Sequence, residues 1–219
     1  MATESMSTGT RAYRSQLRQR QAEQTRARVV AAAAELFASD GYTRTTLAKI
    51  AAAAGVSTET VQGQGPKAAL LIAATEFAAV GVSDEENLLN LDIGRKLIAI
   101  GDPEEAVDFA AAMAADVHTR TAKLAPALLG GADSDPELDR YLTEFIAGIT
   151  GQFRRVLEVF RDRGWLREDV PFDELVQTAA VLCSVEIYLR LVHRGGWSVE
   201  AYRAWCRRML QESVFLRRK

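Results

Sequence analysis

The sequence predicts an all-α fold, with an N-terminal helix-turn-helix domain of three helices and a larger C-terminal helical domain. Ala, Leu, Arg and Glu dominate the 219 residues while β-branched runs are scarce, so helix propensity exceeds strand propensity almost throughout. Apolar residues recur at helical spacing, and Ser, Thr, Asp, Gly and Pro interrupt them where helices begin and end. The 48% hydrophobic content is enough to bury a core at this length.

Charge is distributed unevenly between the two ends of the chain. Residues 1–67 hold 9 Lys and Arg against 5 Asp and Glu, a net charge of +4, whereas the remainder holds 18 against 24, a net charge of −6. A positive end on a negative body favours a head that faces DNA. We expect a flexible basic arm over 1–20, the DNA-binding domain over 21–80, and a helical domain over 81–219. For the arm alone, an alternative remains: it can be a charged tail that contacts only solvent and not DNA.

Four helices are predicted up to residue 80, each bounded by a capping or breaking residue. Their limits are Glu23 to Ser39, ended by Asp40-Gly41; Thr45, as N-cap, to Gly55; Ser57, as N-cap, to Val61 or Gln62; and Pro66 to about Val80.

A loose acidic linker is expected around 81–101, followed by the helices of the body. Asp102, Pro103 and Glu105 have the spacing of an N-cap, a first-turn proline and a capping-box glutamate. The predicted body helices run from Pro103 to about Leu129, with a kink at Pro126; from Asp135-Pro136 to Gly164; from near Pro171 to Gly195-Gly196; and onward from Ser198 as N-cap.

The second and third helices have the pattern of a DNA-reading pair. Apolar or small residues stand where two steeply crossing helices touch, and Gly55 supplies the turn between them. The third helix keeps a polar face that buries nothing and suits the major groove. Beside it, a group of hydroxyls and cations can hold phosphates. The buried set is Ile50, Ala51, Ala54, Val56 and Val61; the base-reading set is Ser57, Thr58, Glu59, Thr60 and Gln62; the phosphate set is Arg44, Thr45, Thr46 and Lys67.

The stretch RARVVAAAAELFASDGYTRTTLAKIAAAAGVSTETV, followed by PKAALL, resembles the DNA-binding domain of the tetracycline-repressor (TetR) family over about residues 23–80. The resemblance implies a homodimer, usually a repressor, that binds double-stranded operator DNA and whose variable C-terminal domain binds a small-molecule effector. The chain departs from the family pattern between Gln62 and Lys67, where it is one residue short. Gln62 replaces the usual backbone-contacting tyrosine, and the second aromatic residue is absent.

The body is expected to supply the dimer contact and the effector site. Apolar stripes on the last two long helices can form a four-helix bundle with a second subunit, although packing inside one subunit stays open. The stripes are Leu175, Thr178, Leu182, Val185, Leu189 and Val192, then Tyr202, Trp205, Met209, Ser213 and Leu216. Bulky and polar residues of 103–163 are expected to line an effector pocket, although each can equally be plain core. They are Phe109, Met113, His118, Tyr141, Phe145, Ile149 and Phe153.

Two other classes of protein compete with a regulator. A helical enzyme could use Glu104-Glu105 or Asp173-Glu174, but His118 and His193 are the only histidines and neither has Glu-x-x-His spacing. Those acidic pairs stand at predicted helix starts, where the helix dipole favours them. We therefore expect no catalytic residues, no metal site and no cofactor. A dimeric ligand-binding or adaptor module that has lost operator binding would share every feature of the body.

Cys183 and Cys206 are the only cysteines, and they lie on different predicted helices without CxxC spacing. We expect two core-facing thiols rather than a zinc site or a disulfide. The N-terminus lacks the apolar stretch of a signal peptide, and the longest uncharged run, Leu175 to Val185, is far short of the roughly 20 residues that span a bilayer. We expect a soluble, cytoplasmic protein without a membrane partner.

Overall fold

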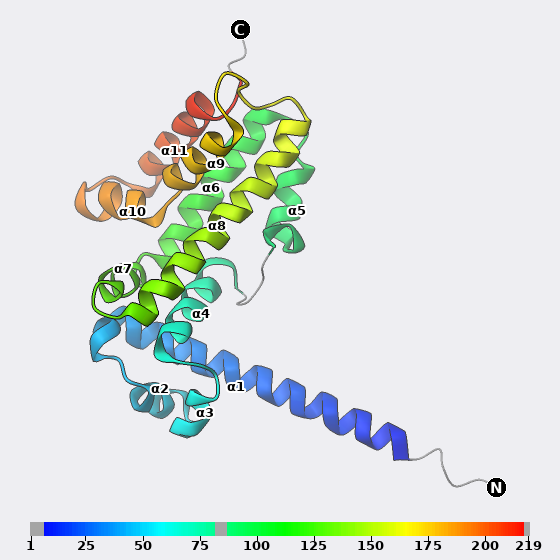
Figure 1. The fold of residues 1–219 in the computed structure, drawn as a ribbon, viewed down its shortest axis with the longest axis vertical. Helices are drawn as coiled ribbons and strands as arrows, with labels where there is room; N and C mark the ends of the chain where they lie inside the picture. Colours follow the sequence, from blue (N-terminus) through cyan, green and yellow to red (C-terminus); the bar gives the residue numbers. More distant parts are fainter. Residues whose placement is uncertain (1–6, 82–86, 217–219) are drawn as a thin grey trace, which may run out of the picture.

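The computed structural model describes residues 7–81 and 87–216, and for 7–16 and Leu88 it describes the backbone alone. Within these ranges the regular structure is helical, apart from an isolated bridge between Leu166 and Phe215. Figure 1 shows a small head at one end of an elongated body of long helices that lie side by side. The predicted all-α fold is confirmed.

The head consists of α1 (Ser7–Arg44), α2 (Leu47–Ala54), α3 (Thr58–Gln62) and the start of α4 (Lys67–Val80). Gly41 has a positive φ of 76°, so α1 breaks at the Asp40-Gly41 pair that predicts its end. Gly55 ends α2 in the left-handed conformation, at φ 65°, which glycine adopts without steric cost.

Helix α1 is longer than predicted. The backbone is helical from Ser7, whereas the sequence analysis expects a flexible arm over 1–20; residues 1–6 lie outside the described ranges. Residues 10–28 contain no proline or glycine and are rich in Arg, Gln and Ala, which are good helix formers. The helix therefore extends outward from its buried part, which starts at Val29, without an apolar stripe of its own. In Figure 1 this helix projects away from the body.

The body helices begin at the predicted caps. The side chains of Asp102, Asp135 and Ser198 each accept hydrogen bonds from backbone amides in the first turn of the helix that follows. The elements are η1 (Leu88–Asn90), α5 (Asp92–Ala99), α6 (Pro103–Thr121), α7 (Ala125–Ala132), α8 (Pro136–Asp162), α9 (Phe172–Leu182), α10 (Val185–Tyr188), the π-helical turn η2 (Leu189–Arg194) and α11 (Val199–Ser213).

Two predictions for the first part of the body are wrong. The expected linker over 81–101 contains α5, whose Leu97 is buried in the body core. The helix expected over 103–129 ends at Thr121, and Pro126 lies in the first turn of α7 instead of kinking a longer helix. Proline is tolerated in the first turn of a helix because a backbone N–H there would have no acceptor within the helix. The break lets α7 turn away from α6 and pack on α1.

The helix expected from Pro171 to Gly195 is interrupted at Cys183 and Ser184. Cys183 caps the end of α9, and the Ser184 side chain accepts from the amide of Ile187 to start α10. The two parts meet at an angle of 41°. No single described helix has the length and hydropathy to cross a membrane, although this bent pair would pass by length and composition.

The described residues form two hydrophobic cores, and one of them joins the head to the body. The body core gathers side chains from α5, α6, α8, α9 and α11. The other core combines α1, α2 and α4 with Leu124 and Leu128 of the α7 region and Leu138 of α8. The Tyr42 hydroxyl adds a hydrogen bond of 2.7 Å to the carboxylate of Asp135, the N-cap of α8. The head is thus packed on the body rather than tethered by a linker.

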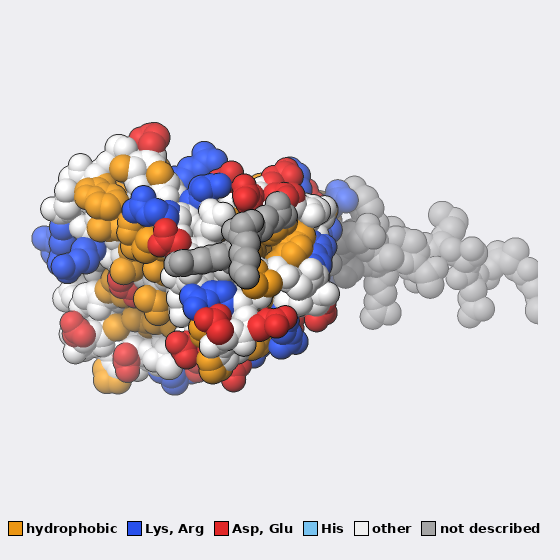
Figure 2. All heavy atoms as spheres, turned by 90° about the horizontal axis from the view of Figure 1, so that it is seen from above, with side chains coloured by type: hydrophobic (Ala, Val, Ile, Leu, Met, Phe, Trp, Pro, Cys, Tyr) orange, Lys and Arg blue, Asp and Glu red, His pale blue; other side chains and the backbone are white. Residues whose placement is uncertain are grey.

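Charges are mixed over the end of the body that lies opposite the head. Figure 2 shows basic and acidic side chains interspersed with apolar ones on this face. A surface of mixed sign offers no continuous basic patch to a nucleic acid. The candidate DNA contact lies instead on the head.

Candidate nucleic-acid interface

Helices α2 and α3 cross over a small apolar contact. Ile50, Ala51, Ala54 and Val61 are buried, and Val56 is half-buried between the helices. These are the five residues that the sequence analysis places at the crossing. Alanine on α2 allows the backbones to approach closely, as a helix-turn-helix requires.

The short helix α3 presents a polar outer face. The Ser57 side chain caps it by accepting from the amide of Thr60 at 3.2 Å, as predicted. Glu59 and Gln62 are exposed, while Thr58 and Thr60 are half-buried. The Thr60 hydroxyl also lies 3.0 Å from that of Ser57, so part of its hydrogen-bonding capacity is used within the helix. Glu59 and Gln62 are therefore the α3 side chains with most freedom to reach base edges.

Glu59 is poised to accept hydrogen bonds. Its own backbone amide, and then the Ser57 hydroxyl, lower the pKa of its carboxyl group. The ionised carboxylate is an acceptor only, and it repels phosphate. In a major groove it can accept from the amino group of cytosine.

The structure leaves some of the predicted phosphate-binding residues exposed and buries another. Arg44 and Thr46 are exposed beside the start of α2, and Thr46 is the N-cap, accepting from the amide of Lys49 at 3.2 Å. Lys49 was missed by the sequence analysis. Its ammonium group lies 2.8 Å from the Asp40 carboxylate on the exposed surface, and only its position on α2 could have indicated it.

Thr45 is not a phosphate ligand or an N-cap, in contrast to the prediction. Its side chain is fully buried, and its hydroxyl donates to the carbonyl oxygens of Leu36 at 3.2 Å and Gly41 at 2.8 Å. The hydroxyl ties the break in α1 to the start of α2 and has no route to DNA. The adjacent threonine, Thr46, takes the cap position.

Lys67 is the first residue of α4, preceded by Pro66 as N-cap rather than as first helical residue. Its ammonium group donates to the Tyr42 carbonyl oxygen at 3.2 Å and lies 3.9 Å from the centre of the Tyr42 ring. Two of its three protons remain for other acceptors. The lysine thus combines a packing role with a position near the candidate interface.

The short link between Gln62 and Lys67 is an ordered turn. The amides of Gly63, Gln64 and Gly65 donate in succession to the carbonyl oxygens of Glu59, Val61 and Gln62, at 2.9 to 3.1 Å. Gly65 has a φ of 125°, a conformation that side chains disfavour. A turn that contains Gly63 and Gly65 therefore closes the shortened link, and it holds Gln62 at the exposed end of α3.

The seven predicted effector residues do not line one cavity. Phe109, Met113 and Phe153 pack against the body core, whereas Tyr141 and Phe145 pack against the core shared with the head. Ile149 is exposed on α8. His118 is buried among tyrosines of α10 and α11.

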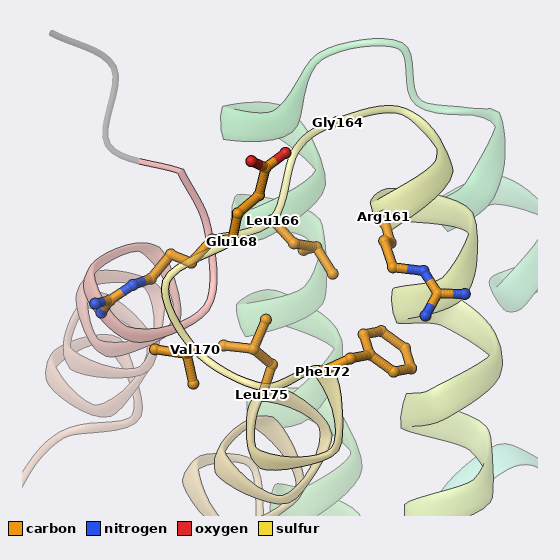
Figure 3. Close-up of a pocket in the computed structure, with 8 residues that line it drawn as sticks. Arg161, Gly164, Leu166, Glu168, Val170, Phe172 and Leu175 are labelled. Carbon is orange, nitrogen blue, oxygen red and sulfur yellow. The ribbon is translucent and has the colours of Figure 1, made fainter.

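Two surface hollows lie near the far end of the body. One, of about 180 Å³, is lined by residues between the end of α8 and the start of α9, including Arg161, Leu166 and Phe172 (Figure 3). The other, of about 370 Å³, lies between the start of α6 and the end of α11. Neither includes a predicted effector residue.

The predicted dimer stripes are partly used inside the subunit. Leu175 and Tyr202 are buried in the body core, so these positions are not available to a second subunit. Val181 on α9 is 58% exposed, and Trp205 on α11 is half-buried. The other stripe residues are half-buried or, like Leu216, exposed, so part of each predicted stripe remains at the surface.

A family model matches part of the head, and solved structures match the fold of the whole chain. Residues 29–62 match the family model of bacterial regulatory proteins, tetR family. No curated protein shows significant similarity to the chain.

Among similar solved structures is a putative TetR-family transcriptional regulator from Syntrophomonas wolfei, with TM-score 0.70 and 17% identity over 86% of this chain and 94% of that one. The fatty acid degradation regulator FadR from Bacillus halodurans has TM-score 0.66 and 19% identity, over 84% and 93%. FadR from Thermus thermophilus, a TetR-family repressor in complex with lauroyl-CoA, has TM-score 0.62 and 26% identity, over 89% and 97%. The helix-turn-helix segment thus matches the model of the tetR family, and the chain as a whole shares the helical fold of regulators of that family.

Proposed function

We propose that this regulator binds a palindromic operator as a homodimer, acts as a repressor, and releases DNA when a small molecule enters its helical body. The outward face of α3 carries the proposal. Glu59 and Gln62 are exposed there while Val61 is fully buried beneath them, so the helix is fixed in place with its polar side free. A helix held in this way fits a major groove.

The dimer is supported by apolar surface on the last helices. Val181 is 58% exposed, and Trp197, before α11, is 39% exposed. Exposed apolar side chains of this kind suit a contact between identical subunits related by a two-fold axis. Two heads would then read half-sites about one helical turn apart.

A ligand in the body can release DNA only if the body contacts the head. Arg120 of α6 makes such a contact. Its guanidinium donates to the carbonyl oxygens of Ala78 at 2.9 Å and Ala79 at 2.6 Å, at the end of α4. A ligand that shifts α6 would pull on α4, whose other end leads to the reading helix. The shift in DNA affinity equals the ligand's differential affinity for the two arrangements.

Ligand binding in the body is supported by relatives of known structure. FadR from Bacillus subtilis was solved with stearoyl-CoA and the Thermus thermophilus FadR with lauroyl-CoA. These acyl-CoA molecules belong to those proteins. For this chain we take from them only that a helical body of this fold can accommodate a ligand.

The test is selection of bound sequences from random DNA duplexes by the full-length protein. We expect an enriched palindrome whose two halves are about one helical turn apart, and a dimer by analytical ultracentrifugation. Affinity for the enriched duplex should fall steeply with salt. A protein that enriches no sequence, and whose weak binding is insensitive to salt, would instead be the adaptor without operator binding.

A further inference from the structure

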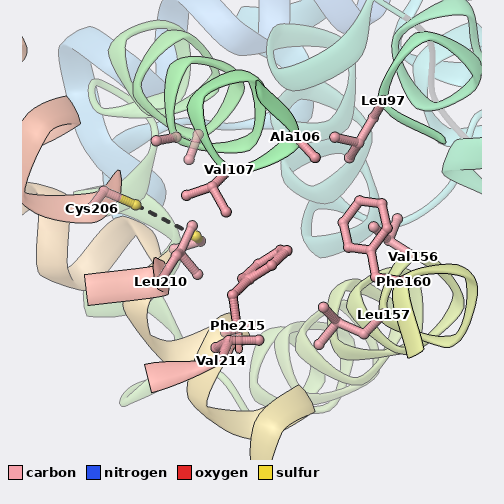
Figure 4. Close-up of a cluster of buried hydrophobic side chains, with 14 of the residues drawn as sticks. Leu97, Ala106, Val107, Val156, Leu157, Phe160, Cys206, Leu210, Val214 and Phe215 are labelled. Carbon is pink, nitrogen blue, oxygen red and sulfur yellow. Dashed lines mark hydrogen bonds between the residues drawn. The ribbon is translucent and has the colours of Figure 1, made fainter. Parts of the chain in front are cut away.

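The first part of α1 extends beyond the rest of the subunit. Residues 17–24 are all exposed, and the buried part of the helix starts at Val29. By contrast, α6, α8 and α11 pack around the body core, where Val107, Phe160 and Leu210 gather (Figure 4). Figure 1 shows the N-terminal end of α1 leading away from both head and body. Residues 7–28 are called the projecting segment.

The projecting segment is strongly basic. Residues 7–28 contain six arginines and one glutamate, a net charge of +5. Arg18, Arg20 and Arg28 are exposed. A homodimer would carry this charge twice, on two helices that extend into solvent. Such a concentration of positive charge attracts a polyanion over about the Debye length, roughly 8 Å at physiological ionic strength.

The segment has no apolar face to offer a partner. Among residues 17–28 the one large apolar side chain is Leu17, which is 46% exposed. A helix that docks in a protein groove or lies in a membrane surface needs an apolar stripe. Positive charge without such a stripe suits a polyanion such as DNA.

The positions of several arginines share a face with the buried part of α1. Steps of three and four residues lead from 11 to 14, 18, 22 and 25 and then to Val29, which is buried in the core that α1 shares with α2 and α4. Helix α1 packs on α2 along that buried part. This face is therefore turned to the side of α1 on which the helix-turn-helix lies. In Figure 1 the projecting segment and α3 both lie at the end of the molecule opposite the C-terminus.

The segment is long enough to follow DNA beyond a half-site. At about 1.5 Å per residue, residues 7–28 span about 33 Å, close to the length of one helical turn of DNA, about 34–36 Å. The segment leads away from the head. When α3 lies in a major groove, the arginines of the segment are therefore placed outside the base pairs that α3 can reach.

We propose that the projecting segment of each subunit lies along the DNA beyond the outer edge of its half-site, and that Arg14 and Arg18 contact the phosphate backbone there. Phosphate contacts carry no sequence information, so this contact adds affinity without changing the preferred operator. The proposal rests on the proposed operator binding and deepens it, because the bound DNA is then longer than the sequence that the helix-turn-helix reads.

The length of the duplex tests this contact in the full-length protein. The operator enriched by selection is prepared as a short duplex that ends with its half-sites, and as a long duplex with about ten more base pairs, one helical turn, at each end. Fluorescence anisotropy should show about tenfold tighter binding to the long duplex, whatever the sequence of the added base pairs. Equal affinity for the two duplexes would overturn the proposal, as would a gain that requires one particular flanking sequence.

A double variant tests the two arginines. Arg14→Gln with Arg18→Gln removes two charges and keeps a good helix-forming residue at each position. The variant should lose most of the gain from the long duplex and keep the wild-type affinity for the short one. The matched control, Lys96→Gln with Lys123→Gln, removes two exposed lysines of the body and should keep the gain. Equal losses in the two double variants would show that only net charge matters, and would overturn the contact.

A charge-keeping variant separates lost charge from a disturbed helix. Arg14→Lys with Arg18→Lys keeps both charges and should keep most of the gain from the long duplex, because lysine also binds phosphate. Loss of the gain in this variant, at the same level as in the glutamine variant, would overturn a contact that depends on charge.

Vesicles of phosphatidylserine and phosphatidylcholine test an anionic membrane as the other polyanionic surface. The wild-type protein should not sediment with them. Sedimentation that the glutamine variant abolishes, together with an unchanged gain on the long duplex, would overturn the proposal in favour of a membrane. The short duplex decides the proposed function separately: a protein that binds both duplexes equally loses only this contact, whereas one that enriches no sequence loses operator binding as well.

Discussion

The hydroxyl of Tyr42 donates to the carboxylate of Asp135 over 2.7 Å, and these two residues join the DNA-binding head to the first turn of α8. The Tyr42 ring also stacks with Phe37 and lies beneath the Lys67 ammonium group. Gly131 of α7 completes the contact from the body side. One side chain of the head thus touches both the candidate DNA-binding lysine and the body.

Tyr42→Phe tests the hydrogen bond at this junction. The ring and its stacking remain, and only the hydroxyl is lost, so we expect the free energy of unfolding to fall by about 1 kcal/mol in urea. Asp135→Ser keeps a capping oxygen but lacks the second oxygen that accepts from Tyr42, and supplies the second arm of a double-mutant cycle. The two losses should not add, because both variants remove the same hydrogen bond. Strictly additive losses would show that the contact contributes nothing.

Gly131→Ala tests how tightly α7 packs on the head. A methyl group there would lie 2.7 Å from Leu138 Cδ2 and 2.9 Å from Cβ of Tyr42, closer than carbon atoms approach. Overpacking of this kind costs about 1–3 kcal/mol, which outweighs the helix-propensity gain of about 1 kcal/mol. Gly130→Ala on the same helix meets nothing within 4 Å and should raise the melting temperature. Similar shifts in both variants would contradict the close contact.

The head could be predicted in detail because its turns depend on local chemistry. Gly55 adopts the left-handed conformation that ends α2, and Ser57 caps α3, as their residue types indicate. The confusion of Thr45 with Thr46 has a physical reason: both are threonines before α2, and only the tertiary position of the Leu36 carbonyl shows which hydroxyl is buried.

One break in the body was hard to predict because neither proline nor glycine stands there. Cys183 and Ser184 end one helix and start another, and Ser184 as a possible cap was the sole local signal. The predicted effector residues failed to gather for a different reason. The helical periodicity predicts that Tyr141 and Phe109 face inward. It does not show that they pack against two different cores.

The burial of His118 predicts a loss of stability in weak acid. Its pKa is lowered to about 4 in the folded state, against about 6.5 when unfolded, so between these values the unfolded chain binds a proton that the folded chain does not. Its contribution to stability is complete above pH 6.5 and is lost as the pH falls toward 4, by about 3 kcal/mol. Urea unfolding at several pH values should show this slope in the wild type. If His118→Phe shows the same slope in that window, the histidine is not its source.

Lys67→Ala tests the candidate phosphate contact. Because Lys67 also packs on Tyr42, the variant should lose some stability. In fluorescence anisotropy, binding to every duplex should weaken by a similar factor, and the slope of log affinity against log salt should become shallower by about one. Lys96→Ala removes an exposed lysine of α5 and serves as the control for net charge. An equal change of slope in both variants would place Lys67 away from the DNA backbone.

Gln62→Ala tests base reading at the exposed end of α3. The glutamine is exposed, and the ordered turn from Gly63 to Gly65 holds its backbone in place, so truncation should leave the fold intact. A glutamine that reads adenine contributes about 1–3 kcal/mol of discrimination, so the variant should lose preference at one position in each half-site. Competition binding with duplexes changed at single positions measures this preference. Gln177→Ala, an exposed glutamine of α9, should keep the full preference. If Gln62→Ala weakens all duplexes equally, the glutamine contacts phosphate, because a phosphate contact carries no sequence information.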